Sequence, residues 1–487
     1  MQHLPEIVSI VVLALMFVIA TARGINMGVL GFIAAAAVGG LVLGMTADEY
    51  LAGFPIDLFV TLLGLTFLFG FAQQNGAIEV VVHAAMRLLR GRVQLAPWVF
   101  FVLTAALIAV GALFAVAIVT PLAMAFARRY RLNLLMTGLM VVHGALAGAF
   151  SPLSVYGVFV NGFLASNGFE PQPLTLFLAP LIANTLFAAA VFLVLHRRPG
   201  LGAPDPHSFG FVAGRQGAVE AAGLAGADEA AVVTDAGAVR ADARLTAGAP
   251  GATSAGDAGT ASGSASDAGA GPAGDAAGLR EAAPRIRPTG IQTLTLVGLV
   301  VMVVGVVGFG LEIGVLSLIV GAVIGIVRPK DAGAALAKVS WSVVVLIGGV
   351  LTYIAVLEAA GTVEWVSSGI GAIGVPLVAA LLLFYLAGIV SALASSLGII
   401  GVVLALSLPF LQEGSVELGG FIAGLAFAAT IVDISPFSTN GAMLLAGVDA
   451  SVRDRFYRQM LVYAGLMVAI GPGVGWLLAA VPTWLAG

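Results

Sequence analysis

Long apolar runs separated by short polar segments make up most of the chain. A run of about 20 apolar residues is long enough to cross a bilayer as a helix. We expect such spans at 5–22, 25–44, 57–73 and 174–195, and again at 291–309, 311–327, 339–357 and 459–483. The more polar stretch 78–93 is typical of an amphipathic surface helix. The pattern therefore predicts an all-α polytopic membrane protein.

Two further apolar regions are interrupted near their middle. "SPLSVYG" at 151–157 and "SPFSTNG" at 435–441 place a Ser-Pro pair and other polar residues inside them. Proline removes a helical hydrogen bond, and free backbone groups are tolerated at membrane depth only inside protein or beside a watery cavity. We therefore expect a broken helix at mid-membrane in each region. For either stretch alone, the alternative is a simple kink whose serine bonds a backbone carbonyl.

The two halves of the chain resemble each other. "NMGVLGFIAAAAVGG" from Asn26 matches "EIGVLSLIVGAVIGI" from Glu312, and "QQNGAIE" from Gln73 matches "EAAGTVE" from Glu358. These matches and the two Ser-Pro stretches keep a nearly constant separation of 284 to 286 residues. We interpret the pattern as an internal duplication.

The apolar run 94–127 determines the predicted topology. It has 34 residues, with "RLLRGR" before it and "RRYR" after it. Two full spans and a turn need more residues, whereas a single span would separate the two basic clusters. A re-entrant hairpin satisfies both constraints, and 375–411 is its counterpart in the second half. Each repeat then has five transmembrane spans plus one hairpin, and an odd number of spans makes the repeats inverted.

Three domains follow from this pattern. Residues 1–198 form an N-terminal membrane repeat, and residues 291–487 form a C-terminal inverted repeat. Residues 199–290 are rich in Ala, Gly, Asp, Ser and Thr without apolar periodicity, as in "GATSAGDAGTASGSASDAGAGPAGDAAG". Such a segment buries too little apolar surface to offset its chain entropy, so we expect a disordered linker.

Composition agrees with the membrane class. The chain is 60% hydrophobic and 9% charged, whereas soluble domains carry about 25% charged residues. It has no cysteine, which excludes disulfides, thiolate metal sites and a cysteine nucleophile. The N-terminal apolar run lacks a basic region before it, so we expect a retained span rather than a cleaved signal peptide.

The basic residues predict an orientation, because they favour the cytoplasmic side. With both termini outside, the topology above places all 21 Lys and Arg residues and the linker in the cytoplasm. The segments "TADEYLAGFPID", "GFEPQP" and "QEGSVELGG" then lie outside and carry acids without bases. We expect a multi-pass protein of the cell (inner or plasma) membrane.

The two broken spans and the two hairpin tips are expected to meet near the middle of the membrane. A helix that begins there presents free N–H groups and a positive dipole end to an anion. The candidate substrate-binding residues are Ser151, Ser154, Tyr156, Ser391, Ser395, Ser396, Ser435, Ser438, Thr439 and Asn440. For the serines of the second tip, the alternative is close helix packing.

Two further residues are candidates for cation coupling. Asp433 is a carboxylate at membrane depth, where acids are functional by default, although a capped structural acid is the alternative. His143 is a candidate proton relay, with a packed histidine as the alternative. Because no Lys or Arg is expected at this depth, a bound dianion needs Na⁺ or a proton to balance it. We expect no cofactor other than a co-bound Na⁺, no metal centre and no nucleic-acid partner.

At these residues the sequence resembles a known family. "SPLSVYG" and the N-terminal half resemble the dicarboxylate carriers typified by the malonate carrier MatC. The two-hairpin inverted repeat resembles the wider superfamily of divalent anion/sodium symporters. The resemblance implies alternating access, a small dicarboxylate such as malonate or a C4 diacid, and a homodimer. That superfamily has Ser-Asn-Thr motifs at its hairpin tips, whereas here the tips read "GALFAV" and "SALASS" and the polar "STN" (438–440) lies in a broken span.

The function expected is secondary active transport of a small dicarboxylate, coupled to Na⁺ or H⁺. A Na⁺/H⁺ antiporter of the same architecture would make Asp433 central, and an arsenite-type oxyanion transporter is a further alternative. A passive channel is also compatible with the residues. An enzyme would need a cluster of bases or metal ligands at depth, and the spacing of His, Asp and Glu gives none, so we expect no enzymatic activity.

Overall fold

The computed structural model describes residues 3–87, 93–196, 288–371, 375–393, 396–414 and 416–486, and these residues form helices joined by short connections. Nearly all of the predicted linker and part of the basic cluster "RLLRGR" lie outside the described residues. The predicted all-helical class is confirmed. Six described helices are long and apolar enough to cross a membrane, namely α1, α4, α10, α13, α16 and α22.

The first half contains α1 (Leu4–Arg23), α2 (Met27–Ala35) with its π-helical continuation η1 (Ala36–Val42), α3 (Ala47–Leu51), α4 (Ile56–Gln74), α5 (Ala77–Arg87), η2 (Val93–Leu95), α6 (Ala96–Ala109), α7 (Ala115–Arg129), α8 (Leu134–Gly148), α9 (Val155–Ser166) and α10 (Pro173–Leu195). The second half contains α13 (Gly290–Phe309), α14 (Ile313–Val327), α15 (Pro329–Ala337), α16 (Trp341–Ala359), α17 (Thr362–Gly371), α18 (Pro376–Ser391), α19 (Ser396–Gln412), α20 (Leu418–Thr430), α21 (Thr439–Ala446) and α22 (Ala450–Ala486).

Both halves place a helix, a break and a second helix at matching positions. These pairs are α6 and α7, matched by α18 and α19, and α8 and α9, matched by α20 and α21. The last helix differs from its prediction because α22 begins at Ala450 rather than at 459. Asp449 explains the earlier start, since its Oδ1 accepts the N–H of Ser451 at 2.9 Å and caps the helix before its apolar part begins.

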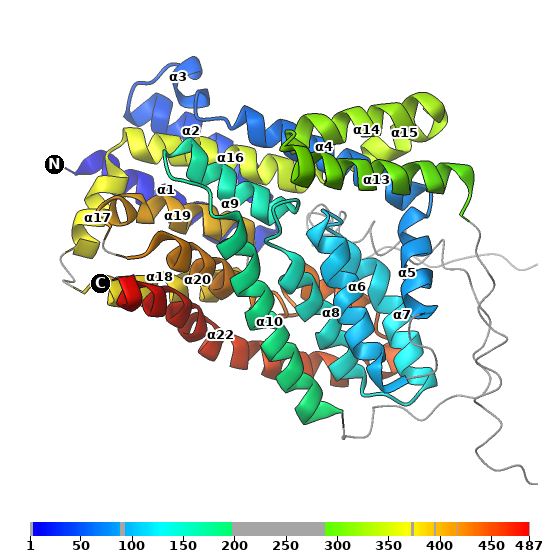
Figure 1. Ribbon diagram of the computed structural model, residues 1–487. Coiled ribbons are helices and arrows are strands. Elements are labelled where there is room, and N and C mark those ends of the chain that lie inside the picture. Colours follow the sequence, from blue (N-terminus) through cyan, green and yellow to red (C-terminus); the bar gives the residue numbers. More distant parts are fainter. Residues whose placement is uncertain are drawn as a thin grey trace, which may run out of the picture.

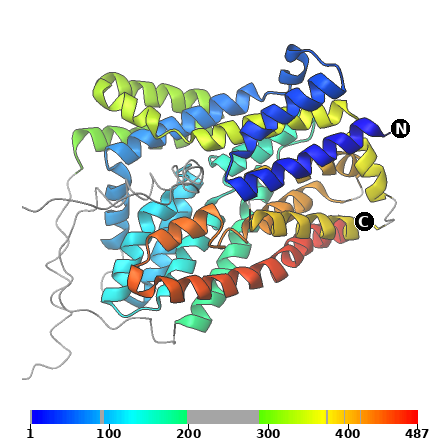
Figure 2. The ribbon, with the colours of Figure 1, turned by 180° about the vertical axis from the view of Figure 1, so that it is seen from behind.

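The helices form two layers in Figure 1. We call α1, α2, α4, α13, α14 and α16 the upper layer, and α6, α7, α8, α10, α18, α20, α21 and α22 the lower layer. Figure 2 shows the same division from behind, with α22 along the lower edge. Helices α9 and α19 contact each other and connect the layers, because α9 packs on α4 and α19 packs on α16.

Glycines allow the upper-layer helices to pack backbone against backbone. A Cβ atom on Gly349 of α16 would lie 1.8 Å from the carbonyl oxygen of Gly28 in α2. A Cβ atom on Gly64 of α4 would lie 2.3 Å from the carbonyl oxygen of Gly314 in α14. Gly28 corresponds to Gly314 and Gly64 to Gly349 in the repeat, so the same contact is made twice with the halves exchanged.

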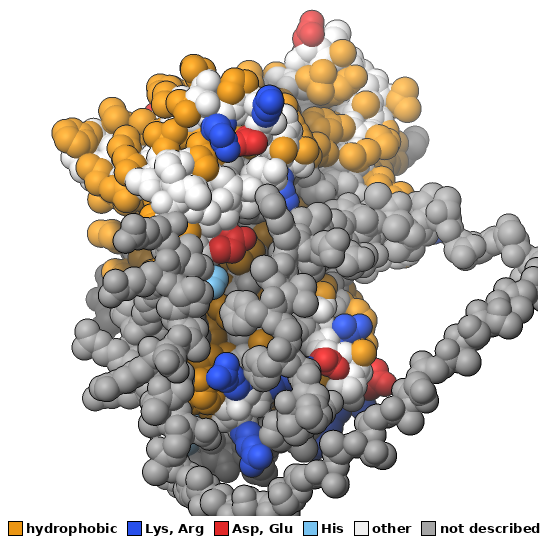
Figure 3. Space-filling model, turned by 90° about the vertical axis from the view of Figure 1, so that its right-hand side faces the viewer, with side chains coloured by type: hydrophobic (Ala, Val, Ile, Leu, Met, Phe, Trp, Pro, Cys, Tyr) orange, Lys and Arg blue, Asp and Glu red, His pale blue; other side chains and the backbone are white. Residues whose placement is uncertain are grey.

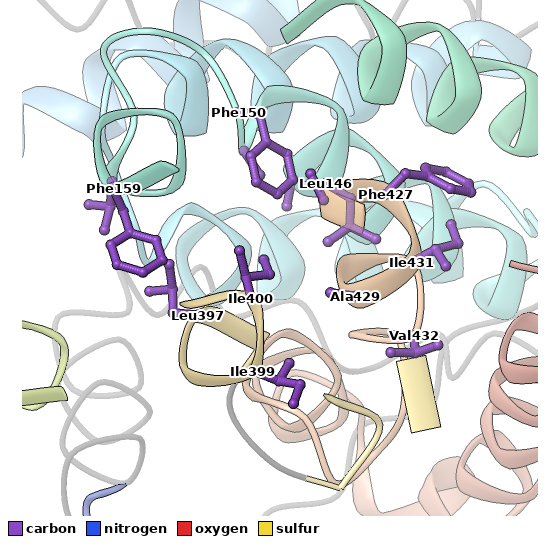
Figure 4. Packing of buried hydrophobic residues seen from close by; sticks show 14 of the residues in the cluster. Leu146, Phe150, Phe159, Leu397, Ile399, Ile400, Phe427, Ala429, Ile431 and Val432 are labelled. Carbon is purple, nitrogen blue, oxygen red and sulfur yellow. The ribbon is translucent and has the colours of Figure 1, made fainter. Parts of the chain in front are cut away.

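The break residues lie in the apolar core except Pro152 and Phe437, whose side chains are exposed. Figure 4 shows buried side chains from the two halves packed together around them: Leu146, Phe150, Phe159, Leu397, Ile399, Ile400, Phe427, Ala429, Ile431 and Val432. The other residues of both breaks are buried, so most of the irregular backbone is enclosed by protein.

The two chain termini lie at the same end of the molecule, on the left of Figure 1. Figure 3 views the molecule from the opposite end and shows Lys and Arg side chains on that face. Basic side chains are thus present on the face opposite to the termini.

Candidate functional site

The first break, residues 149–154, separates α8 from α9. Ser154 caps α9, since its Oγ accepts the N–H of Gly157 at 3.2 Å. The same hydroxyl donates within the break, where the carbonyl oxygens of Ser151 (2.8 Å) and Ala149 are both in reach. A Cβ atom on Gly157 would lie 2.0 Å from the carbonyl oxygen of Ser151, so the turn admits only glycine there.

The second break, residues 431–438, repeats this geometry between α20 and α21. Ser438 Oγ accepts the N–H of Gly441 at 3.3 Å and lies 2.7 Å from the carbonyl oxygen of Ser435. It also lies 2.6 Å from the carbonyl oxygen of Asp433. A Cβ atom on Gly441 would lie 1.8 Å from the carbonyl oxygen of Ser435. The two breaks are therefore one backbone motif built twice.

Each break contains two serines, the one before its proline and a second one three residues later, and these four serines shape the breaks. Ser151 and Ser435 each accept a backbone N–H two residues later, both at 3.3 Å. Ser154 and Ser438 cap the half-helices, and all four side chains are buried. The serine-to-carbonyl bonding expected of a kink is present, but each helix stops and a new one starts.

Each hairpin tip packs on the break of its own half. In the first tip, residues 110–114, a Cβ atom on Gly111 would lie 3.3 Å from the carbonyl oxygen of Leu153 in the first break. In the second tip, Ser396 Oγ lies 2.5 Å from Asp433 Oδ1. Ser395 lies outside the described residues.

Ser391, Ser396 and Asp433 form a buried polar cluster. Their side chains are 0%, 3% and 4% exposed. Ser391 Oγ lies 2.8 Å from Ser396 Oγ and 2.5 Å from the carbonyl oxygen of Ala429. Tyr156 of α9 interacts through its hydroxyl with Ser396 and with the carboxyl of Asp433. The cluster thus joins residues from three of the four chain interruptions.

Thr439 and Asn440 differ from the serines because they are open to a ligand. They occupy the first turn of α21, where Thr439 is exposed and Asn440 is half-buried. Within the part of the chain that the structure describes, neither side chain has a hydrogen-bond partner. Their repeat counterparts in α9 are Val155 and Tyr156.

His143 lies apart from this cluster in a separate buried network. Its Nε2 is 2.7 Å from the Tyr463 hydroxyl, and its Nδ1 is 3.1 Å from Asn184 Oδ1. Asn184 Nδ2 donates to the carbonyl of Pro180, which leaves Oδ1 to accept from His143. Nε2 of a neutral imidazole then accepts from the tyrosine. This is the environment of the packed histidine, and Asn184 and Tyr463 are partners that the sequence analysis missed.

An ion pair connects two helices of the lower layer, α7 and α22. Arg128 Nη1 at the end of α7 lies 2.7 Å from Asp449 Oδ2 at the start of α22. This guanidinium, together with the N–H and hydroxyl of Ser451, holds the pKa of Asp449 well below its usual range. Glu79 and Glu364, which occupy matching positions in the two repeats, lie in the first turns of α5 and α17.

Comparison with protein families gives one finding. Residues 3–149 match the family described as Dicarboxylate carrier protein MatC N-terminus. The match runs from α1 to the end of α8 and stops two residues before Ser151, so "SPLSVYG" lies just beyond it. None of the curated proteins compared with the chain matches it.

Proposed function

We propose that this protein is a secondary active transporter of a small dicarboxylate, of the malonate or C4 type. The match of residues 3–149 to the MatC N-terminus supports a membrane transporter for this class of anion. The structural observation on which the proposal rests is the twofold occurrence of the Ser-Pro break inside the core.

Each break starts a half-helix whose first N–H groups have no acceptor within the helix. Such a start attracts a carboxylate through its N–H groups and its dipole. Two matched starts, α9 and α21, suit a ligand with two carboxylates. Tyr156 at one start and Asn440 at the other would orient the ligand by hydrogen bonds.

We further propose that the two repeats are inverted. Gly28 faces Val345 and Gly31 faces Gly349, so α2 and α16 run in the same direction. Gly314 faces Thr61, and Gly321 faces Phe67, so α14 and α4 also run in the same direction. Because α2 and α4 are successive spans of opposite direction, α2 and its counterpart α14 are antiparallel. The Lys and Arg side chains on the face opposite to the termini support termini outside and a cytoplasmic linker (Figure 3).

The hairpins are proposed to be re-entrant. Helices α6 and α7 have 14 and 15 residues. At 1.5 Å per residue they are about 21–23 Å long, which is short of a hydrocarbon core of roughly 30 Å. Helices α18 and α19, with 16 and 17 residues, are about 24–26 Å long by the same rise. Each pair turns back inside the protein, where the tip meets a break.

Transport by alternating access would move the lower layer against the upper layer, with α9 and α19 between them. The lower layer contains both breaks and both hairpins' first arms, whereas the upper layer is locked by the glycine contacts. A homodimer and coupling to Na⁺ or H⁺ belong to the same proposal.

Counterflow tests the proposal directly. Proteoliposomes containing the purified chain are preloaded with unlabelled malonate, succinate, acetate or arsenite, and uptake of labelled malonate is followed. Preloading with either diacid should drive uptake, while acetate should not. Protein-free liposomes and the Ser407→Ala variant, which removes an ordinary serine-to-backbone bond in α19, are the controls.

Absence of counterflow with every diacid would overturn the proposal. Uptake driven by arsenite alone would favour the oxyanion transporter instead.

A Na⁺/H⁺ antiporter remains the second candidate because a buried acid, Asp433, stands in one repeat only. It is distinguished by adding NaCl to proteoliposomes that contain a pH-sensitive dye. An antiporter changes the internal pH without any dicarboxylate, whereas the proposed carrier requires one.

A further inference from the structure

We infer that Asp433 is protonated in this conformation, and that this proton is the ion that moves with the substrate. The first part depends on the hydrogen-bond geometry of the polar cluster. The second part rests on the proposed function and names its coupling ion as H⁺ rather than Na⁺.

The number of hydrogens in the cluster carries the inference. Three short contacts run in a chain from Asp433 to Ser396 (2.5 Å), from Ser396 to Ser391 (2.8 Å) and from Ser391 to the carbonyl oxygen of Ala429 (2.5 Å). Each contact joins two oxygens and needs one hydrogen. A serine hydroxyl brings one hydrogen and a carbonyl brings none, so the two serines supply two of the three. The third must come from the Asp433 carboxyl.

Protonation also gives the chain a single direction. Asp433 donates to Ser396, Ser396 donates to Ser391, and Ser391 donates to the Ala429 carbonyl. Ala429 lies in the last turn of α20, where backbone carbonyls lack a partner within the helix. With an ionised Asp433, one of the contacts would hold two oxygens together without a hydrogen, in a site that water does not reach.

Tyr156 does not change this count. Its hydroxyl interacts with Ser396, which adds one contact and one hydrogen to the cluster. Four contacts then share three hydroxyl hydrogens, and the missing hydrogen is again that of Asp433.

Among the residues that the structure describes, no charged group lies close enough to Asp433 to stabilise its ionised form. The groups that act on its carboxyl are Ser396 and Tyr156, both neutral. Among the described titratable groups of the helices packed around it, Tyr385 of α18 donates to the Ala469 carbonyl, while His143 of α8 and Tyr463 of α22 bond each other. The charged residues of α22 lie in its first turns, where Arg453 bonds the Val448 carbonyl. A buried carboxylate without a cation is costly.

This arrangement links the proton to the substrate. A dianion bound at the starts of α9 and α21 would be repelled by an ionised Asp433, which lies in the break that precedes α21. The repulsion is strong in a medium of low dielectric. Binding therefore requires the neutral acid. On release, the O–H bond of Asp433 breaks, the proton passes to water on the open side, and Ser396 reverses to donate to the carboxylate. Protonation from water on the other side restores the chain shown here.

Infrared difference spectroscopy tests the protonation without any transport assay. Purified protein is titrated with base, and the carboxylic acid C=O stretch is followed. We expect one buried-acid band that persists at neutral pH, disappears in Asp433→Asn and shifts in Ser396→Ala. The matched control Asp331→Asn, a half-buried acid paired with Arg328, should leave the band unchanged. A wild-type spectrum without an Asp433-dependent band at neutral pH would overturn the inference.

Transport tests the coupling. Labelled malonate uptake into proteoliposomes is measured with an inward pH gradient in the absence of Na⁺, and with a Na⁺ gradient at equal pH. The pH gradient should raise malonate accumulation by the wild type about tenfold or more. In Asp433→Asn the same gradient should not raise accumulation. The asparagine amide still donates to Ser396, so the variant keeps the hydrogen-bond chain.

The outcomes separate the two proposals. Accumulation driven by Na⁺ equally in wild type and Asp433→Asn overturns proton coupling and leaves the dicarboxylate carrier intact. Wild-type protein without counterflow of any diacid overturns the carrier, while the infrared band still decides whether Asp433 holds a proton.

Discussion

The two breaks share one backbone and differ in their chemistry. Both have a serine cap, a second serine that accepts an N–H, and a glycine pressed against a carbonyl oxygen. The positions that the backbone does not constrain have diverged between the first and second break: Ala149 and Asp433, Leu153 and Phe437, Val155 and Thr439, Tyr156 and Asn440. The shared residues build the motif, and the differing residues distinguish what each copy can bind.

The exposure of the two breaks follows the same division. Leu153 is 6% exposed, whereas its counterpart Phe437 is 60% exposed, next to the exposed Thr439. The second break thus combines two exposed side chains, Phe437 and Thr439, with a buried acid, Asp433.

The largest effect is expected where the two breaks are alike. Gly157→Ala and Gly441→Ala each place a Cβ atom about 2 Å from a carbonyl oxygen, so the backbone has to move. We expect each to lower stability by roughly 3 kcal/mol or to prevent folding. Fluorescence-detected thermal unfolding in detergent measures this. Gly465→Ala in α22, where a Cβ atom meets open space, is the matched control, and equal melting temperatures for all three variants would contradict the shared motif.

The second-largest effect should appear in one break only. Asn440→Ala removes an unpaired polar group at the start of α21, while its counterpart position carries Tyr156. Hydrogen bonds to charged ligands contribute roughly 1.5–3 kcal/mol, so the apparent affinity for malonate should fall about tenfold or more. The amount of folded protein should stay the same. Concentration-dependent uptake provides the measurement, and an unchanged half-saturation concentration would remove Asn440 from the site.

Ser154→Ala and Ser438→Ala should cost about 1 kcal/mol of stability each, as expected for the loss of a helix cap. This differs from a pure loss of affinity, because each hydroxyl bonds the backbone of its own break. Thermal unfolding of the two variants should give equal shifts. Ser407→Ala is the control, and a stability loss in one break alone would show that the two caps are not equivalent.

The smallest effect concerns the ion pair between Arg128 and Asp449 at the start of α22, and it depends on pH. The pKa of Asp449 is lowered by Arg128, so the ion pair contributes stability above the ordinary pKa of an aspartate, about 3.9, and loses it as the pH falls through the lowered value. Both partners are more than a third exposed, which limits the contribution to about 0.5 kcal/mol. Melting temperatures of wild type and Asp449→Asn should lie closer together at pH 3 than at pH 7, without becoming equal, because pH 3 is below the ordinary pKa of an aspartate but above the lowered one. A difference that grows on acidification would contradict the assignment.

Much of the fold follows from the apolar runs and their interruptions. The spans 5–22, 57–73 and 174–195 coincide with α1, α4 and α10 within two residues at either end. The positions of the breaks follow from Ser-Pro inside apolar sequence. The short helices α3 and α15 were missed because they lack an apolar face long enough to detect.

The site was less predictable because its contacts join distant residues. Ser396 and Asp433 are 37 positions apart, and His143 and Tyr463 are 320 positions apart, so spacing alone could not pair them. Sequence reasoning also could not separate a serine that binds a ligand from one that caps a helix, since both need the same hydroxyl. The asymmetry between Ala149 and Asp433, in contrast, was already readable from the repeat.

The exchanged glycine contacts have a consequence for biogenesis. Helix α2 makes its closest backbone contacts with α16, and α4 makes them with α14, so the first repeat is synthesised before the helices that cover its glycines. It has to remain unfinished in the bilayer until the second repeat is inserted beside it.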